Sequence, residues 1–188
     1  MIFKYSFYIE LIIWLFPPFK QYKGGLFVYF LIIALTPLFS VVCYHYFKVI
    51  PFSAYVVSSI AIIIALQNYK GSGIWTGLSL LIILTTLVLY LNDYKIDLFI
   101  NIILRGVIIA YLYFFMLEFL YSKKAINIYY IVLVVYELSI ILKMLTILTN
   151  INMGVLFYHI TTIFEILICF YFIFFNIENS PQFKFNKK

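Results

Sequence analysis

The chain has 188 residues, of which 66% are apolar, 22% aromatic and only 11% charged. Soluble domains carry about 25% charged residues, so this composition excludes a soluble globular domain and predicts an integral membrane protein. The net charge of +6 does not indicate nucleic-acid binding, because the lysines stand singly or in pairs and form no basic block. We therefore expect an all-α bundle of transmembrane helices that has the lipid bilayer, and no nucleic acid, as a partner.

Seven apolar runs are candidates for membrane spans, each of which takes about 20 residues in a helix. Polar turns separate several of them, such as QNYKGSG from residue 67 and NDYKID from residue 92. We predict a single seven-helix transmembrane domain over residues 1–176 and a short basic cytoplasmic tail over residues 177–188. The predicted spans are Ile2–Phe16, Gly25–Tyr46, Ile50–Gln67, Ile74–Leu91, Leu98–Tyr121 and the two halves of Ala125–Asn176.

Prolines interrupt the first two runs. Pro17 and Pro18 stop the first run, which we interpret as a membrane helix. A signal peptide is the alternative, but Glu10 would then lie inside its apolar region and no cleavage site of small residues follows. Pro37 predicts a kink in the second run, because proline removes one backbone hydrogen bond from a helix.

The distribution of lysine and arginine predicts the orientation, because cytoplasmic loops carry the excess of these residues. With seven spans, the two sides of the membrane receive unequal numbers of lysines. One side holds Lys20, Lys23, Lys70, Lys123, Lys124, Lys184, Lys187 and Lys188, and the other holds Lys4, Lys48 and Lys95. We therefore predict an N-terminus outside and a C-terminus in the cytoplasm, in the cytoplasmic membrane of a bacterium.

The last three spans contain polar and ionisable groups at membrane depth. Such groups are costly in lipid and normally turn toward the interior of a helix bundle. At 1.5 Å per residue, Arg105 lies roughly 12 Å below the outer surface, and two glutamates lie near the midplane. The candidate ligand-binding residues are Arg105, Lys143, His159, Asn101, Glu137 and Glu165.

Helical spacing indicates which of these groups share a face. Asn101 and Arg105 are four residues apart, so they lie on one face of the fifth span. Glu137 points about 240° away from Lys143, so each of the two is expected to meet a neighbouring helix. One polar stripe on the last span consists of His159, Thr162 and Glu165.

Two interpretations of these charges remain open. In the structural interpretation, Arg105 pairs with Glu137 or Glu165 and holds the helices in register. In the functional interpretation, the outer half of the bundle contains a polar cavity that binds a small polar or anionic solute. Arg105 would be the main anion ligand, Lys143 and His159 would assist it, and the two glutamates would bind protons or counter-ions.

The sequence offers little support for catalysis. It contains no GxxxxGK[ST], GxGxxG, HExxH, CxxC or GxSxG motif, so we expect no nucleotide cofactor, no metal and no serine-hydrolase site. An enzyme remains an alternative through a thiol: Cys43 activated by His159, with Arg105 stabilising the oxyanion, would form an acyl-transfer set.

The leading prediction is a multi-pass membrane protein that binds and transports a small polar or anionic solute through an outward-facing site. The second interpretation is a non-catalytic accessory or sensor subunit, which would act through a partner membrane protein or as a homo-oligomer. The intramembrane acyl-transfer enzyme is the third.

Overall fold

The computed structural model describes residues 2–22, 24–48, 51–68, 93–151 and 153–184, so the predicted span Ile74–Leu91 lies outside the described residues. Four described helices are long and apolar enough to cross a membrane, as expected of a multi-pass membrane protein. They are α3 (Phe27–Phe47), α6 (Tyr94–Lys123), α7 (Ile128–Leu148) and α8 (Gly154–Phe174). Shorter helices are α1 (Ile2–Ile13), α2 (Phe16–Lys20) and α4 (Phe52–Asn68). The predicted helical class is confirmed.

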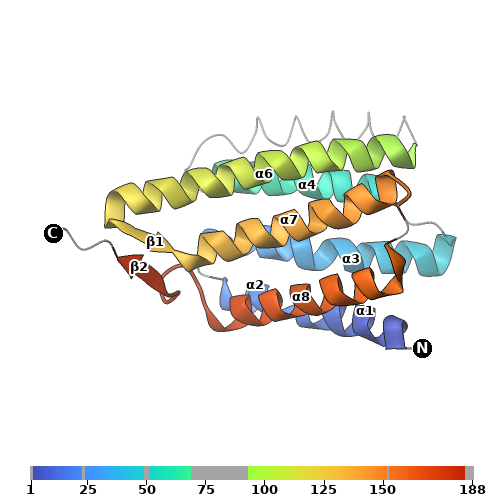
Figure 1. Ribbon diagram of the computed structural model, residues 1–188, viewed down its shortest axis with the longest axis horizontal. Coiled ribbons are helices and arrows are strands. Elements are labelled where there is room, and N and C mark those ends of the chain that lie inside the picture. The colour runs from blue at the N-terminus through green and yellow to red at the C-terminus, as the bar shows by residue number, and fades with distance from the viewer. Residues whose placement is uncertain (1, 23, 49–50, 69–92, 152, 185–188) are drawn as a thin grey trace.

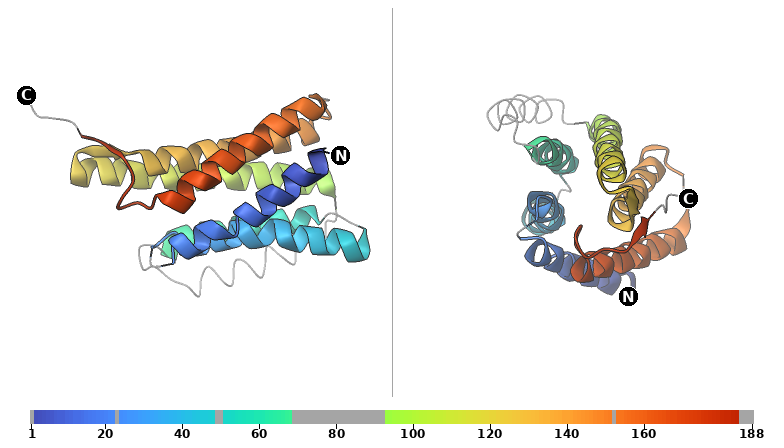
Figure 2. Two further views of the ribbon diagram at one scale, coloured as in Figure 1. Left: turned by 90° about the horizontal axis from the view of Figure 1, so that it is seen from below. Right: turned by 90° about the vertical axis from the view of Figure 1, so that its left-hand side faces the viewer.

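The helices form a ring. In the order α1, α3, α4, α6, α7 and α8, each helix packs against the next, and α8 packs against α1 (Figure 2). The helices run along the same long axis, and the two termini lie at opposite ends of the bundle (Figure 1). A cavity or a core inside the ring is therefore bounded by helices from both halves of the chain.

The prolines act at two positions. The first helix, α1, ends at Ile13, three residues before the predicted end at Phe16, and Pro17 and Pro18 are buried in the first turn of α2. By contrast, α3 continues past Pro37. The hydroxyl of Thr36 donates to the carbonyl oxygen of Ile32 at 2.7 Å, so a polar side chain adds a hydrogen bond in the turn beside the proline.

A small antiparallel sheet, which we call the clamp, ties the end of the chain to the bundle. The clamp consists of β1 (Ala125–Asn127) and β2 (Gln182–Lys184) and lies where α6 ends (Figure 1). Asn127 Nδ2 donates to the carbonyl oxygen of Ile177 at 2.7 Å, and its Oδ1 caps α7 by accepting from the amide of Tyr129 at 2.9 Å.

The clamp differs from the sequence prediction in two respects. Residues from Ala125 were expected to be helical, and residues 177–188 were expected to form a short basic cytoplasmic tail. Instead, residues 125–127 are extended, and residues 182–184 pair with them. The reason is that a short apolar strand has no periodicity that separates it from the start of an apolar helix.

Candidate functional site

A cavity of about 400 Å³ lies inside the ring, and every ring helix contributes to its lining. It occupies the half of the bundle away from the clamp, which we call the cavity half and which contains the start of α6 and the end of α7. Its walls are mostly apolar and include the aromatic side chains of Trp14, Phe52, Tyr55, Tyr136 and Tyr158. This volume and this lining are typical of pockets for small molecules.

The first ion pair of the site joins α6 to α7. Arg105 Nη1 donates to Glu137 Oε2 at 2.8 Å, and the hydroxyl of Tyr29 donates to Glu137 Oε1 at 2.6 Å. The Glu137 side chain is completely buried and Arg105 is almost so. The predicted structural pairing of Arg105 thus has Glu137 as its partner, and Arg105 also lines the cavity.

The second ion pair joins α7 to α8. Lys143 Nζ donates to Glu165 Oε2 at 2.6 Å, and Ser139 Oγ donates to Glu165 Oε1 at 2.9 Å. The carboxyl group of Glu10, on α1, is hydrogen-bonded to Glu165. Since a carboxylate has no donor, a hydrogen bond between two carboxyl groups requires a proton on one of them. This cluster therefore connects three helices and can hold a proton.

A polar stripe on α6 faces the cavity. It consists of Asp97, Asn101 and Arg105, which are spaced by four residues and all line the cavity. Asn101 Oδ1 accepts from the hydroxyl of Ser59 on α4 at 2.6 Å. The shared face of Asn101 and Arg105 was predicted from the sequence.

Asp97 is a cavity residue that the sequence interpretation did not name as a candidate. It was taken for a loop charge beside Lys95, although it continues the spacing of Asn101 and Arg105 by one turn. Asp97 is only 5% exposed to solvent. Among the described residues, Asp97 Oδ1 and Arg105 Nε are buried side-chain atoms without a hydrogen-bond partner. A buried polar atom of this kind indicates a place where a ligand or a water molecule binds.

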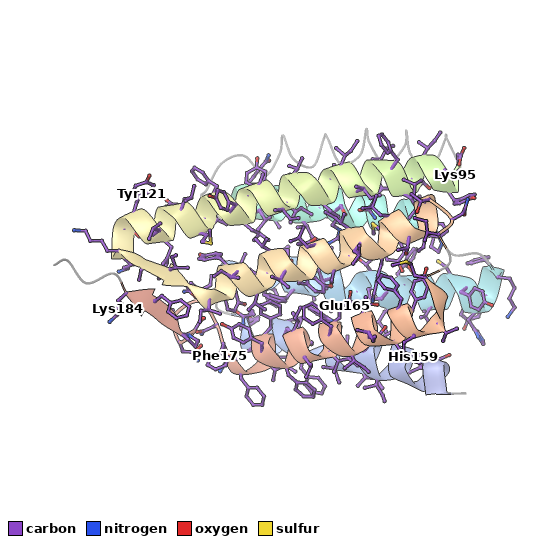
Figure 3. All side chains as sticks on the ribbon, in the orientation of Figure 1. Lys95, Tyr121, His159, Glu165, Phe175 and Lys184 are labelled. Atoms are coloured by element: carbon purple, nitrogen blue, oxygen red, sulfur yellow. The ribbon has the colours of Figure 1, made fainter. Side chains whose placement is uncertain are left out.

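The remaining candidates lie apart from the cavity. His159 is on α8, nearer the start of that helix than Glu165 (Figure 3), and it is not among the described residues that line the cavity. Cys43 lines a different groove, between α3 and α4, to which neither Arg105 nor His159 contributes. The structure therefore does not gather the three groups of the acyl-transfer alternative at one cavity.

An apolar cluster fills the ring between the cavity and the clamp. Its fully buried members include Phe30, Tyr129, Leu133 and Phe172, and it continues to Tyr29 beside the first ion pair. We call these five residues, four of which are aromatic, the aromatic floor; they lie in the core on the clamp side of the cavity.

No protein-family model, curated protein or solved structure matches this chain. The chemistry of the cavity is therefore the basis for inferring its function. Two ion pairs, a carboxyl pair and two unpartnered polar atoms, set among apolar walls, form an arrangement suited to recognising a small polar molecule.

Proposed function

We propose that this protein binds and transports a small polar or anionic solute across the cytoplasmic membrane of a bacterium. The observation that carries the proposal is the cavity, whose lining includes residues with buried polar atoms that have no partner among the described residues, and which has the aromatic floor on its clamp side. A site that reaches only half-way through a bundle is expected of a carrier that exposes its solute to one side at a time. The Glu10–Glu165 pair is a candidate proton site for such a cycle.

We further propose seven spans, with the cavity half outside. The shorter helices α1 and α4 and the run Ile74–Leu91 would complete the seven. Consistent with an odd number, the termini lie at opposite ends of the bundle (Figure 1). The lysines at the clamp end, where positive charge favours the cytoplasm, are Lys20, Lys123, Lys124 and Lys184.

The proposed orientation predicts the labelling of single cysteines. Lys95→Cys, at the start of α6, should react in intact cells with a maleimide that does not cross membranes. Lys123→Cys, at the other end of α6, should react only after permeabilisation. Both side chains are exposed, and a Cys43→Ala background removes the native thiol that is partly accessible. The reverse pattern would show that the cavity half faces the cytoplasm.

Filling the cavity should abolish solute binding. Thr162→Phe places an aromatic ring in the lining of the cavity, so a solute that fits the wild type should bind at least ten-fold more weakly. Binding is measured as the increase in thermal stability of the protein in detergent when each member of a panel of amino acids, sugars, amines and carboxylates is added. A solute at a hundred-fold excess over its Kd stabilises by about 2.7 kcal/mol. Uptake of that solute into proteoliposomes should fall with its binding.

The matched control is Ile163→Phe, because Ile163 is the next residue on α8 and is exposed on the outer surface of the ring. It should leave binding and uptake unchanged. If no member of the panel stabilises the wild type, or if Thr162→Phe transports like the wild type, the solute-carrier function is wrong. An accessory or sensor subunit acting through a partner membrane protein would then be favoured.

A further inference from the structure

The charge balance of the cavity is the starting point. Its charged lining residues are Glu10, Asp97, Arg105, Lys143 and Glu165. Each of the two basic groups is already bound to a carboxylate, Arg105 to Glu137 and Lys143 to Glu165. The acidic groups are therefore in excess, and an added anion would have to compete with carboxylates that hold both cations in place.

The surplus of negative charge is located at Asp97. The carboxyl group of Glu10 is hydrogen-bonded to Glu165, so these two groups can share one proton. Asp97, in contrast, has a buried oxygen without a partner among the described residues. A buried carboxylate is stable when it is paired with a cation, so we expect a positively charged donor to bind beside Asp97.

The neighbouring walls suit a cation as well. Phe52 and Tyr55 of α4 and Tyr158 of α8 line the same cavity as Asp97. Aromatic faces attract ammonium groups, and this attraction is strongest where the cation is desolvated. At the other end of the polar stripe on α6, Arg105 Nε is a donor without a partner among the described residues, so it would donate a hydrogen bond to an acceptor group carried by the same solute.

We infer that the solute carries an ammonium group, which binds at Asp97 among the aromatic side chains of the cavity, and an acceptor group for Arg105 Nε. This inference rests on the proposed function and assigns the chemical class of its solute. A small zwitterion or an amino alcohol has both groups.

Four probes of one shape test the inference, because they vary the two charges independently. Choline has the ammonium group as its only charge and a neutral hydroxyl as its acceptor, and glycine betaine has both an ammonium group and a carboxylate. The tert-butyl analogue of choline has neither charge, and tert-butylacetate has only the carboxylate. Binding of each to the purified wild-type protein is measured by calorimetry and by thermal unfolding in detergent. Choline and glycine betaine should each bind at least ten-fold more tightly than their tert-butyl analogues.

The variant Asp97→Asn removes the charge and keeps the shape of the side chain, so it should weaken both ammonium probes at least ten-fold. Asp93→Asn is the matched control, since Asp93 is the exposed N-cap residue of α6, four residues before Asp97, and asparagine can cap the helix equally well. It should change binding less than two-fold. The comparison of probes on the wild type stands even if Asp97→Asn fails to fold.

The outcomes separate the two claims. If tert-butylacetate binds as tightly as glycine betaine, the ammonium inference is overturned. The proposed function then stands, with an anion as the solute. Equal binding of the ammonium probes to wild type and Asp97→Asn also overturns it. If none of the four probes binds and no amine, carboxylate or sugar in the wider panel does, both the inference and the proposed function are overturned.

Discussion

Replacing Glu137 by leucine is expected to destabilise the protein by about 3–5 kcal/mol, because it leaves a buried guanidinium group without its counter-ion. Glu137 is completely buried and accepts hydrogen bonds from both Arg105 and Tyr29. Its removal therefore costs one ion pair and one hydrogen bond from a hydroxyl to a carboxylate at the contact of α3, α6 and α7. Reversible unfolding in detergent micelles measures the change.

A double variant distinguishes a lost ion pair from general damage to the packing. In Arg105→Met with Glu137→Leu both charges are absent, so the unpaired guanidinium no longer exists and much of the lost stability should return. Tyr29→Phe is a milder control, which removes only the hydroxyl that donates to the Glu137 carboxylate and should cost about 1.5–3 kcal/mol. If the double variant is as unstable as the sum of the two single variants, the pair does not act as a unit.

This pair also shows what the sequence could predict. Helical spacing placed Glu137 and Lys143 on different faces, and in the structure each meets a neighbouring helix, Arg105 on α6 and Glu165 on α8. Periodicity within one helix determines which residues share a face. It does not determine which of several carboxylates a cation selects, because that choice depends on how the helices pack.

The sequence interpretation missed two features, for different reasons. Asp97 stands in a polar turn in the sequence, and only the extension of α6 back to Tyr94 places it on the face of Asn101. The clamp joins residues more than fifty positions apart, and each of its strands is too short to show an alternating pattern. The clamp depends on a tertiary contact between distant segments, whereas the position of Asp97 depends on where α6 begins.

The second large effect is expected in the aromatic floor. Phe172→Ala should destabilise the protein by about 3–5 kcal/mol, because a fully buried ring is replaced by a cavity that its neighbours cannot fill. The Phe172 ring lies 4.9 Å from that of Phe30 and 5.2 Å from that of Tyr129, centroid to centroid, and the side chain is inaccessible to solvent. Unfolding in detergent measures the loss.

Phe174→Ala is the matched control, since Phe174 is two residues further along α8 and is 64% exposed on the outside of the ring. The same truncation there should change the stability by less than about 0.5 kcal/mol. Equal losses in the two variants would contradict the assignment of inner and outer faces to α8.

The aromatic floor also has a functional consequence, because Phe172→Ala removes part of the barrier between the cavity and the clamp. In proteoliposomes, a carrier with this variant should therefore leak its solute down a gradient, whereas Phe174→Ala should not.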